Sequence, residues 1–200
     1  MKKAAVAVLL GTALVPSLPA QEFTEPGSGT KFPVKVEGMT LLGAGLRTRT
    51  FLKVKVYAAG LYVADPALTG PLAAFKGQLS SPAFYAELVR GDFPKQVTMK
   101  FLRDLGADQI QEAMRDALAG ADKARVDAFV GYVPASQSGQ ECVLRWAPGG
   151  TLETVMAGAP RPPIADKAFA SAVFAIWLGE KPIQADLKKG MVSRAGELVR

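Results

Sequence analysis

Four cations precede a long apolar run, and they are the residues of this sequence best placed to do chemistry. The segment 43–65, GAGLRTRTFLKVKVYAAGLYVAD, carries Arg47, Arg49, Lys53 and Lys55 before it becomes apolar. A guanidinium beside apolar side chains is suited to binding a carboxylate, because its fork of donors matches the two oxygens of the acid. The alternative is that the cations keep an edge strand soluble, which we expect of Arg49, Lys53 and Lys55.

Other kinds of catalytic site are excluded by residues that the chain lacks. It contains no histidine, which removes Ser-His-Asp catalysis, His-ligated zinc and His-ligated haem. The single cysteine, Cys142, alternates with Leu144 and Trp146 in a predicted strand, so we expect a buried, unreactive thiol. No phosphate-binding glycine loop or dinucleotide-binding motif is present. Carboxylates such as Asp104 and Glu112 are scattered, and we expect no metal and no cofactor.

The amino-terminal residues are typical of a secretory signal peptide. Met1-Lys2-Lys3 precedes an apolar segment, 4–15, and a small residue, Ala20, stands before Gln21. The alternative, a membrane anchor, would need roughly 20 apolar residues. We therefore predict cleavage near Ala20–Gln21 and a protein, 21–200, that is periplasmic or secreted and keeps no membrane span.

Length and charge limit the remaining classes. About 180 residues without a low-complexity linker or internal repeat indicate one domain with its own core. The net charge of +6 falls to +4 without Lys2 and Lys3, and the cations form no long runs. We therefore expect no nucleic-acid partner. The sequence does not indicate an oligomeric state.

The positioning elements follow from hydrophobic periodicity. Alternation predicts a strand at 32–39, a second short strand or a turn at 40–48, and the longest strand at 51–64, with Leu52, Val54, Val56 and Ala58 as one apolar face. Further strands are predicted after Pro94, at 95–102, and on both sides of Gly149-Gly150, whereas 159–163 is predicted as a connector. Helices are predicted at 71–78, 83–89, 106–120, 123–130, 164–179 and after Pro182 up to Gly190. This order predicts an α+β fold, with a large antiparallel sheet covered on one face by helices.

Three segments resemble the chalcone isomerase-like superfamily, and its bacterial exported branch in particular. They are GAGLRTRTFLKVKVYAAGLYV, VRGDFPKQVTMKFLRDLGADQIQEAMRDAL and FAIWLGEKPIQADLKKGM, and the resemblance covers most of residues 32–192. It implies an open-faced β-sandwich with a ligand cleft between sheet and helices. It also implies one of two functions, an isomerase that closes a flavanone ring or a non-catalytic fatty-acid-binding protein.

The resemblance can be carried over to individual positions. Arg47 matches the arginine that the superfamily places in its pocket, and Lys100 matches a pocket lysine of the enzymes. Tyr57 stands where the enzymes have a threonine, Ile110 near their tyrosine, and Ala117 in place of their asparagine. Compared with the enzymes, this sequence keeps the pocket arginine as Arg47 but lacks most of the neutral hydrogen-bond donors. Loss of one oxyanion donor typically costs about 2.7–4 kcal/mol in the barrier.

We therefore expect a non-catalytic binder of a fatty acid or similar anionic amphiphile, with Arg47, Tyr57 and Lys100 as ligand-binding residues. One alternative is an isomerase, an intramolecular lyase that acts on a chalcone-like enone through Arg47 and Lys100. The other is an envelope structural or partner-binding domain without a small ligand. A cleft filled by side chains, or a salt bridge from Arg47 to an internal carboxylate, would favour that last reading.

Overall fold

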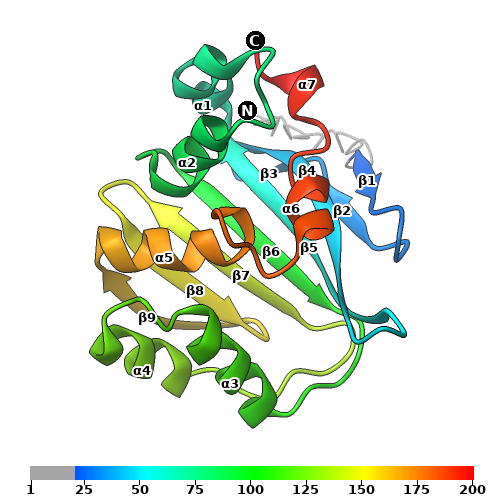
Figure 1. Cartoon of the computed structure of the whole chain (residues 1–200), viewed down its shortest axis with the longest axis vertical. Coiled ribbons are helices and arrows are strands. Elements are labelled where there is room, and N and C mark those ends of the chain that lie inside the picture. Colours follow the sequence, from blue (N-terminus) through cyan, green and yellow to red (C-terminus); the bar gives the residue numbers. More distant parts are fainter. Residues whose placement is uncertain (1–20) are drawn as a thin grey trace, which may run out of the picture.

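A seven-stranded antiparallel sheet forms the body of the molecule (Figure 1). The computed structural model describes residues 21–200, so the predicted signal peptide, 1–20, lies outside the described residues. The strands lie side by side in chain order: β3 (Lys35–Val36), β4 (Met39–Arg49), β5 (Val54–Ala64), β6 (Lys95–Phe101), β7 (Glu141–Ala147), β8 (Thr151–Met156) and β9 (Ala159–Ala165).

The helices cover one face of this sheet (Figure 1). They are α1 (Asp65–Thr69), the 3₁₀ helix η1 (Pro71–Phe75), α2 (Pro82–Arg90), α3 (Ala107–Ala117), α4 (Lys123–Gly131), α5 (Lys167–Leu178), α6 (Ala185–Gly190) and α7 (Ala195–Leu198). On the other face, the small hairpin of β1 (Glu22–Thr24) and β2 (Lys31–Pro33) covers part of the sheet, where Phe32 is fully buried. The α+β prediction, with helices on one face of a large antiparallel sheet, is confirmed. Within residues 21–200, each helix is too short or too polar to cross a bilayer.

Strand β5 separates two apolar clusters, as a central strand with period-2 side chains should. From Tyr57 onward its odd-numbered residues, including Ala59 and Leu61, belong to the main core beneath the helices. Its even-numbered residues Ala58 and Tyr62 belong to the smaller cluster around Phe32. The core therefore places the odd positions of β5 toward the helices, which is the side that holds the cleft described below.

The predicted apolar face of residues 52–58 is wrong in its first half. Residues 50–53 form the turn between β4 and β5, and Leu52 is 71% exposed there. The register then shifts, because Arg47 pairs with Tyr57 but the next residue, Thr48, pairs with Lys55. Val56 is thus an extra residue in β5, and such a bulge re-aims the side chains next to it. As a result, Val56 and Tyr57 both line the same cleft.

Two further predictions need comment. For residues 40–48 the strand alternative is confirmed and the turn alternative is wrong, but the strand, β4, is longer than predicted, at eleven residues. Residues 159–163, predicted as a connector because of their prolines, begin β9. That strand lies at the end of the sheet, where a missing backbone donor is tolerated.

Glycines in β4 allow helix α6 to lie directly on the sheet. A Cβ atom added to Gly45 would lie 2.6 Å from the carbonyl oxygen of Leu187 in α6, and one added to Gly43 would lie 2.4 Å from that of Gly190. Real side chains essentially never approach backbone atoms so closely. The close packing of α6 on β4 therefore depends on the absence of side chains at these positions.

Replacing Gly45 by alanine is expected to lower the free energy of unfolding by about 1–3 kcal/mol, because α6 must move away from β4. Urea unfolding measures the change. Gly131→Ala is the control, since a Cβ atom at Gly131 meets nothing within 4 Å, and we expect a change below about 0.5 kcal/mol. Equal stability of Gly45→Ala and the wild type would contradict the close contact.

Candidate functional site

A cleft of about 760 Å³ opens between the sheet and helices α3 and α5. Small-molecule sites typically measure roughly 300–1,000 Å³. Its charged residues, apart from Arg47, are exposed and are of both signs: Arg49, Glu112, Asp116, Glu180 and Lys181. Its deeper wall is apolar and is formed by buried side chains of the sheet, α3 and α5: Val56, Met99, Phe101, Ile110, Ile176 and Trp177.

Arg47 is a half-buried cation at this cleft, and neutral groups hold it. Its Nη1 donates to the carbonyl oxygen of Thr48 at 2.9 Å and to Oε1 of Gln184 at 3.1 Å. The same Oε1 accepts a hydrogen bond from the backbone N–H of Thr48 at 3.0 Å. Among residues 21–200, no carboxylate lies within 4.0 Å of the guanidinium, and its Nε and Nη2 make no hydrogen bond. The guanidinium is therefore oriented without being neutralised.

Gln184 was not predicted as part of the site. It precedes α6 as the N-cap residue and lies 137 positions from Arg47 in the chain. Its place beside Arg47 follows from the packing of α6 on the glycines of β4. No local pattern around residue 184 marks that contact.

Tyr57 lies directly opposite Arg47 in the β4–β5 pair, so the two side chains share one face of the sheet. Its hydroxyl oxygen accepts a hydrogen bond from Nε1 of Trp177 at 3.0 Å. Because a phenol has one hydrogen to donate, this contact leaves the O–H of Tyr57 available to a ligand. Burial raises the pKa of Tyr57 to about 12, opposed in part by the Trp177 hydrogen bond and by Arg47. The phenol therefore stays a neutral donor near pH 7.

Lys100 is not among the residues that line the cleft. Its Nζ forms an ion pair with Glu141 at 2.9 Å and lies 5.3 Å from the ring centre of Phe32 on the opposite face of the sheet. The reason is strand alternation, since the neighbours Met99 and Phe101 both face the cleft. The structure thus brings Arg47 and Tyr57 together and separates Lys100 from them.

The remaining candidates for chemistry are inert in this arrangement. Cys142 is buried, and burial raises the pKa of its thiol to about 12. Such a thiol is a poor nucleophile near neutral pH. Within residues 21–200, no group of three or more Cys, Asp or Glu side chains is arranged to hold a metal ion.

The model of one protein family, described as chalcone isomerase-like, matches residues 21–193. The chain belongs to the chalcone isomerase-like family. It is 26% identical to chalcone–flavanone isomerase 1A of Glycine max, over 86% of this chain and 91% of that protein. Its fold is similar to the crystal structure of a fatty-acid-binding protein of Arabidopsis thaliana, with a TM-score of 0.75 and 18% identity. That match covers 90% of this chain and 99% of the other.

Two positions that the sequence resemblance places at or near polar residues of the chalcone isomerases are apolar in this protein. Ile110 and Ala117, on α3, both line the cleft. Gln109 also lines it and is exposed, and its Oε1 accepts a hydrogen bond from the N–H of Gly106 at 3.3 Å. The wall that α3 contributes to the deep part of the cleft is therefore largely without hydrogen-bond donors.

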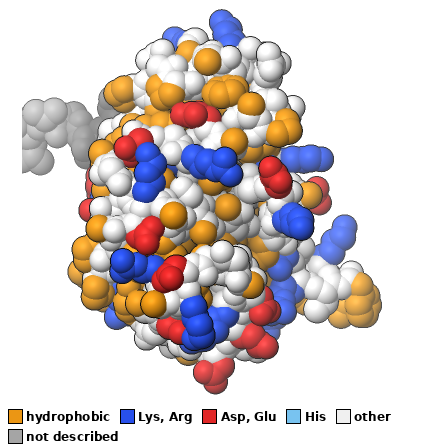
Figure 2. Space-filling model, turned by 60° about the vertical axis from the view of Figure 1, so that its left-hand side comes forward, with side chains coloured by type: hydrophobic (Ala, Val, Ile, Leu, Met, Phe, Trp, Pro, Cys, Tyr) orange, Lys and Arg blue, Asp and Glu red, His pale blue; other side chains and the backbone are white. Residues whose placement is uncertain are grey.

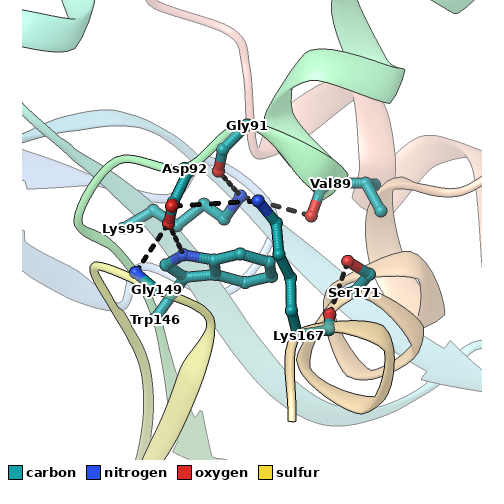
Figure 3. Close-up of polar contacts among 8 residues, drawn as sticks. All are labelled: Val89, Gly91, Asp92, Lys95, Trp146, Gly149, Lys167 and Ser171. Carbon is teal, nitrogen blue, oxygen red and sulfur yellow. Dashed lines mark hydrogen bonds and ion pairs between the residues drawn. The ribbon is translucent and has the colours of Figure 1, made fainter.

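A second basic side chain, Lys95, makes its hydrogen bonds within the fold and not toward the cleft (Figure 3). Lys95 is completely buried, and its Nζ donates to the carbonyl oxygens of Gly91 at 2.8 Å and Val89 at 3.2 Å. It also lies 4.0 Å from the ring centre of Trp146. The indole N–H of Trp146 donates in turn to Asp92 at 3.1 Å. Lys95 therefore joins the end of α2 to β7.

The Lys95 amine should make stability depend on pH. Burial lowers its pKa to about 7 from 10.5, although Glu87 and Asp92 oppose this. Between these two values the unfolded chain holds a proton that the folded chain lacks, so the free energy of unfolding rises with pH. Below pH 7 both states hold the proton, and this increment is absent.

We expect the free energy of unfolding to rise by about 1–2 kcal/mol between pH 7 and 8.5, and we expect Lys95→Met to flatten the rise. Urea unfolding at a series of pH values measures it. The window stops at 8.5 because the raised pKa values of Cys142 and Tyr57 oppose the Lys95 slope above their unfolded values of 9.0 and 10.0. A flat wild-type profile would show that the carbonyls and the Trp146 ring keep the amine charged.

Proposed function

We propose that the protein is an exported, non-catalytic binder of a fatty acid or a similar anionic amphiphile. Arg47 and Tyr57 bind the acid group, and the apolar wall of the cleft binds the tail. The observation that carries this proposal is a guanidinium at an apolar cleft with no carboxylate partner within residues 21–200.

The energetics favour an anionic ligand at this place. A partly buried cation loses hydration, and the loss is offset when an anion with good hydrogen-bond geometry pairs with it. Gln184 and Thr48 occupy only Nη1 of Arg47, so Nε and Nη2 are available for a two-oxygen contact. The O–H of Tyr57 adds a third, neutral donor. A carboxylate would accept all three hydrogen bonds, whereas an alcohol would leave most of them unmade.

The comparisons support a hydrophobic ligand without identifying it. The solved protein of similar fold is described as fatty-acid binding, and here the cleft wall is made of aromatic and aliphatic side chains. The remaining hypothesis, an envelope structural or partner-binding domain without a small ligand, predicts a filled cleft or an internal salt bridge to Arg47. The described residues contain neither.

Arg47→Met is expected to weaken binding of a long-chain fatty acid by about tenfold to a hundredfold, because charge-assisted hydrogen bonds contribute about 1.5–3 kcal/mol. Displacement of a fluorescent fatty acid measures the affinity. The fatty alcohol of equal chain length should bind the wild type more weakly and should lose little affinity in the variant. The variant is therefore expected to lose the preference for the acid over the alcohol.

Arg90→Gln is the matched control, since Arg90 is exposed at the end of α2 and does not line the cleft. It removes one positive charge and should leave the affinity unchanged. Equal loss in both variants would indicate a general charge effect, and an unchanged affinity in Arg47→Met would overturn the assignment of Arg47.

The second candidate is an isomerase acting on a chalcone-like enone, and it is favoured by the relative named chalcone–flavanone isomerase. We expect no rate above the spontaneous ring closure, because Ile110 and Ala117 supply no donor to a developing enolate. A panel of chalcones followed by absorbance tests this. A rate in the wild type that falls in Tyr57→Phe and Arg47→Met would establish catalysis instead.

The proposed location rests on the sequence of residues 1–20, which fits a cleavable signal peptide. Export to the periplasm or outside the cell follows from it. Amino-terminal sequencing of the exported protein should begin at Gln21, and a retained residue 1 would contradict cleavage.

A further inference from the structure

The tip of the β4–β5 hairpin exposes two large hydrophobic side chains. Phe51 is 92% exposed and Leu52 is 71% exposed, whereas the other large hydrophobic side chains of residues 21–200 are buried or half-buried. Figure 2 shows the tip as a projection at the lower right, with hydrophobic side chains at its end and Lys or Arg side chains nearby. Exposing a phenylalanine and a leucine together in water is unfavourable, so their position needs an explanation.

The backbone holds this pair away from the body of the protein. The N–H of Lys53 donates to the carbonyl oxygen of Thr50 at 3.1 Å, which closes a turn around Phe51 and Leu52. Thr50 and Lys53 have φ angles of 65° and 52°, in the left-handed region that residues other than glycine seldom adopt. The hydrophobic pair is therefore presented by a defined turn that departs from the strand conformation on both sides.

The tip is also cationic and carries no acid. Arg49, Lys53 and Lys55 are all exposed, and none of them pairs with a carboxylate among residues 21–200. Residues 38–64 contain no Asp or Glu. Three free cations around two exposed hydrophobic side chains are complementary to a surface that is apolar beneath a layer of negative charge.

We propose that this tip, residues 49–55, docks onto a bilayer that contains anionic lipid. Phe51 and Leu52 enter the boundary between headgroups and acyl chains, and the three cations contact the headgroups. Membrane-surface binding by a protein combines these two terms, buried apolar area and attraction to anionic lipid. A convex tip with two apolar side chains suits a deformable liquid surface better than a protein partner, because stable protein interfaces bury about 800 Å² on each side.

Docking at this tip would bring the cleft to the membrane. Arg47 and Arg49 lie on the strand that leads into the tip, and both line the cleft. Under the proposed function, an amphiphile could then pass between bilayer and cleft over a short path. The docking itself does not rest on that function, since it is measured without a bound ligand.

Vesicle flotation with the exported protein tests the proposal. The wild type and each variant are compared in the same processed form. One set of vesicles is phosphatidylcholine alone, and the other also contains phosphatidylglycerol. We expect the protein to bind the anionic vesicles about tenfold or more tightly than the neutral ones. Binding to the anionic vesicles should weaken as the salt concentration rises. Phe51→Ser combined with Leu52→Ser should lower it about tenfold, as should Lys53→Glu combined with Lys55→Glu.

A matched control separates docking by the tip from general charge. Lys76→Glu combined with Arg90→Glu makes the same change in net charge at exposed positions near η1 and α2, and it should retain binding within about twofold. Circular dichroism melts show whether each variant is folded.

A tryptophan at the tip gives a direct readout of insertion. The native residues Trp146 and Trp177 are buried, so the emission of Phe51→Trp should shift to shorter wavelength with anionic vesicles while that of the wild type stays unchanged. Failure of the wild type to bind anionic vesicles would overturn the proposal. So would equal loss in the control pair, or a tip that binds a protein or a second copy of the chain but no vesicle.

Discussion

The arrangement of the candidate site depends on the direct packing of α6 on β4. Gly45 and Gly43 leave no side chain between the strand and the helix, so the N-cap residue of α6 lies next to Arg47. That residue is Gln184, and its carboxamide oxygen binds both the guanidinium of Arg47 and the backbone of Thr48. A neutral acceptor fixes the direction of the cation and leaves its charge for a ligand. A carboxylate in the same position would fix the direction and cancel the charge.

Three cations of the sheet illustrate what decides whether a charge is structural or functional. Lys95 is enclosed by carbonyl oxygens and the Trp146 ring, so its amine finds its hydrogen-bond acceptors within the fold. Lys100 pairs with Glu141 on the far face of the sheet. Arg47 alone among these three borders the cleft, and within residues 21–200 its Nε and Nη2 make no hydrogen bond. Burial by itself therefore does not distinguish Arg47 from Lys95, whereas an unmet hydrogen-bonding capacity beside a cavity does.

The sequence predicts the fold class well because period-2 and period-3.6 patterns are local. The helix over 106–120 and the turn at Gly149-Gly150 follow from such patterns, and the structure has α3, β7 and β8 there. The alternation of Lys100 with Met99 and Phe101 is local as well, but only the structure shows which face of the strand holds the cleft. The β5 bulge could not be predicted, since it depends on the pairing of Tyr57 with Arg47. Gln184 could not be predicted either, because its role depends on a contact between distant segments.

The most direct test of the central claim is a crystal structure of the exported protein with a long-chain fatty acid bound. We expect the carboxylate oxygens within about 3.2 Å of Nε or Nη2 of Arg47 and of the Tyr57 hydroxyl, the range of good hydrogen bonds. We also expect the acyl chain to lie against the apolar wall formed by the sheet, α3 and α5. A carboxylate bound instead by Arg49 or Lys181 at the exposed mouth, with Arg47 still held only by Thr48 and Gln184, would contradict this claim.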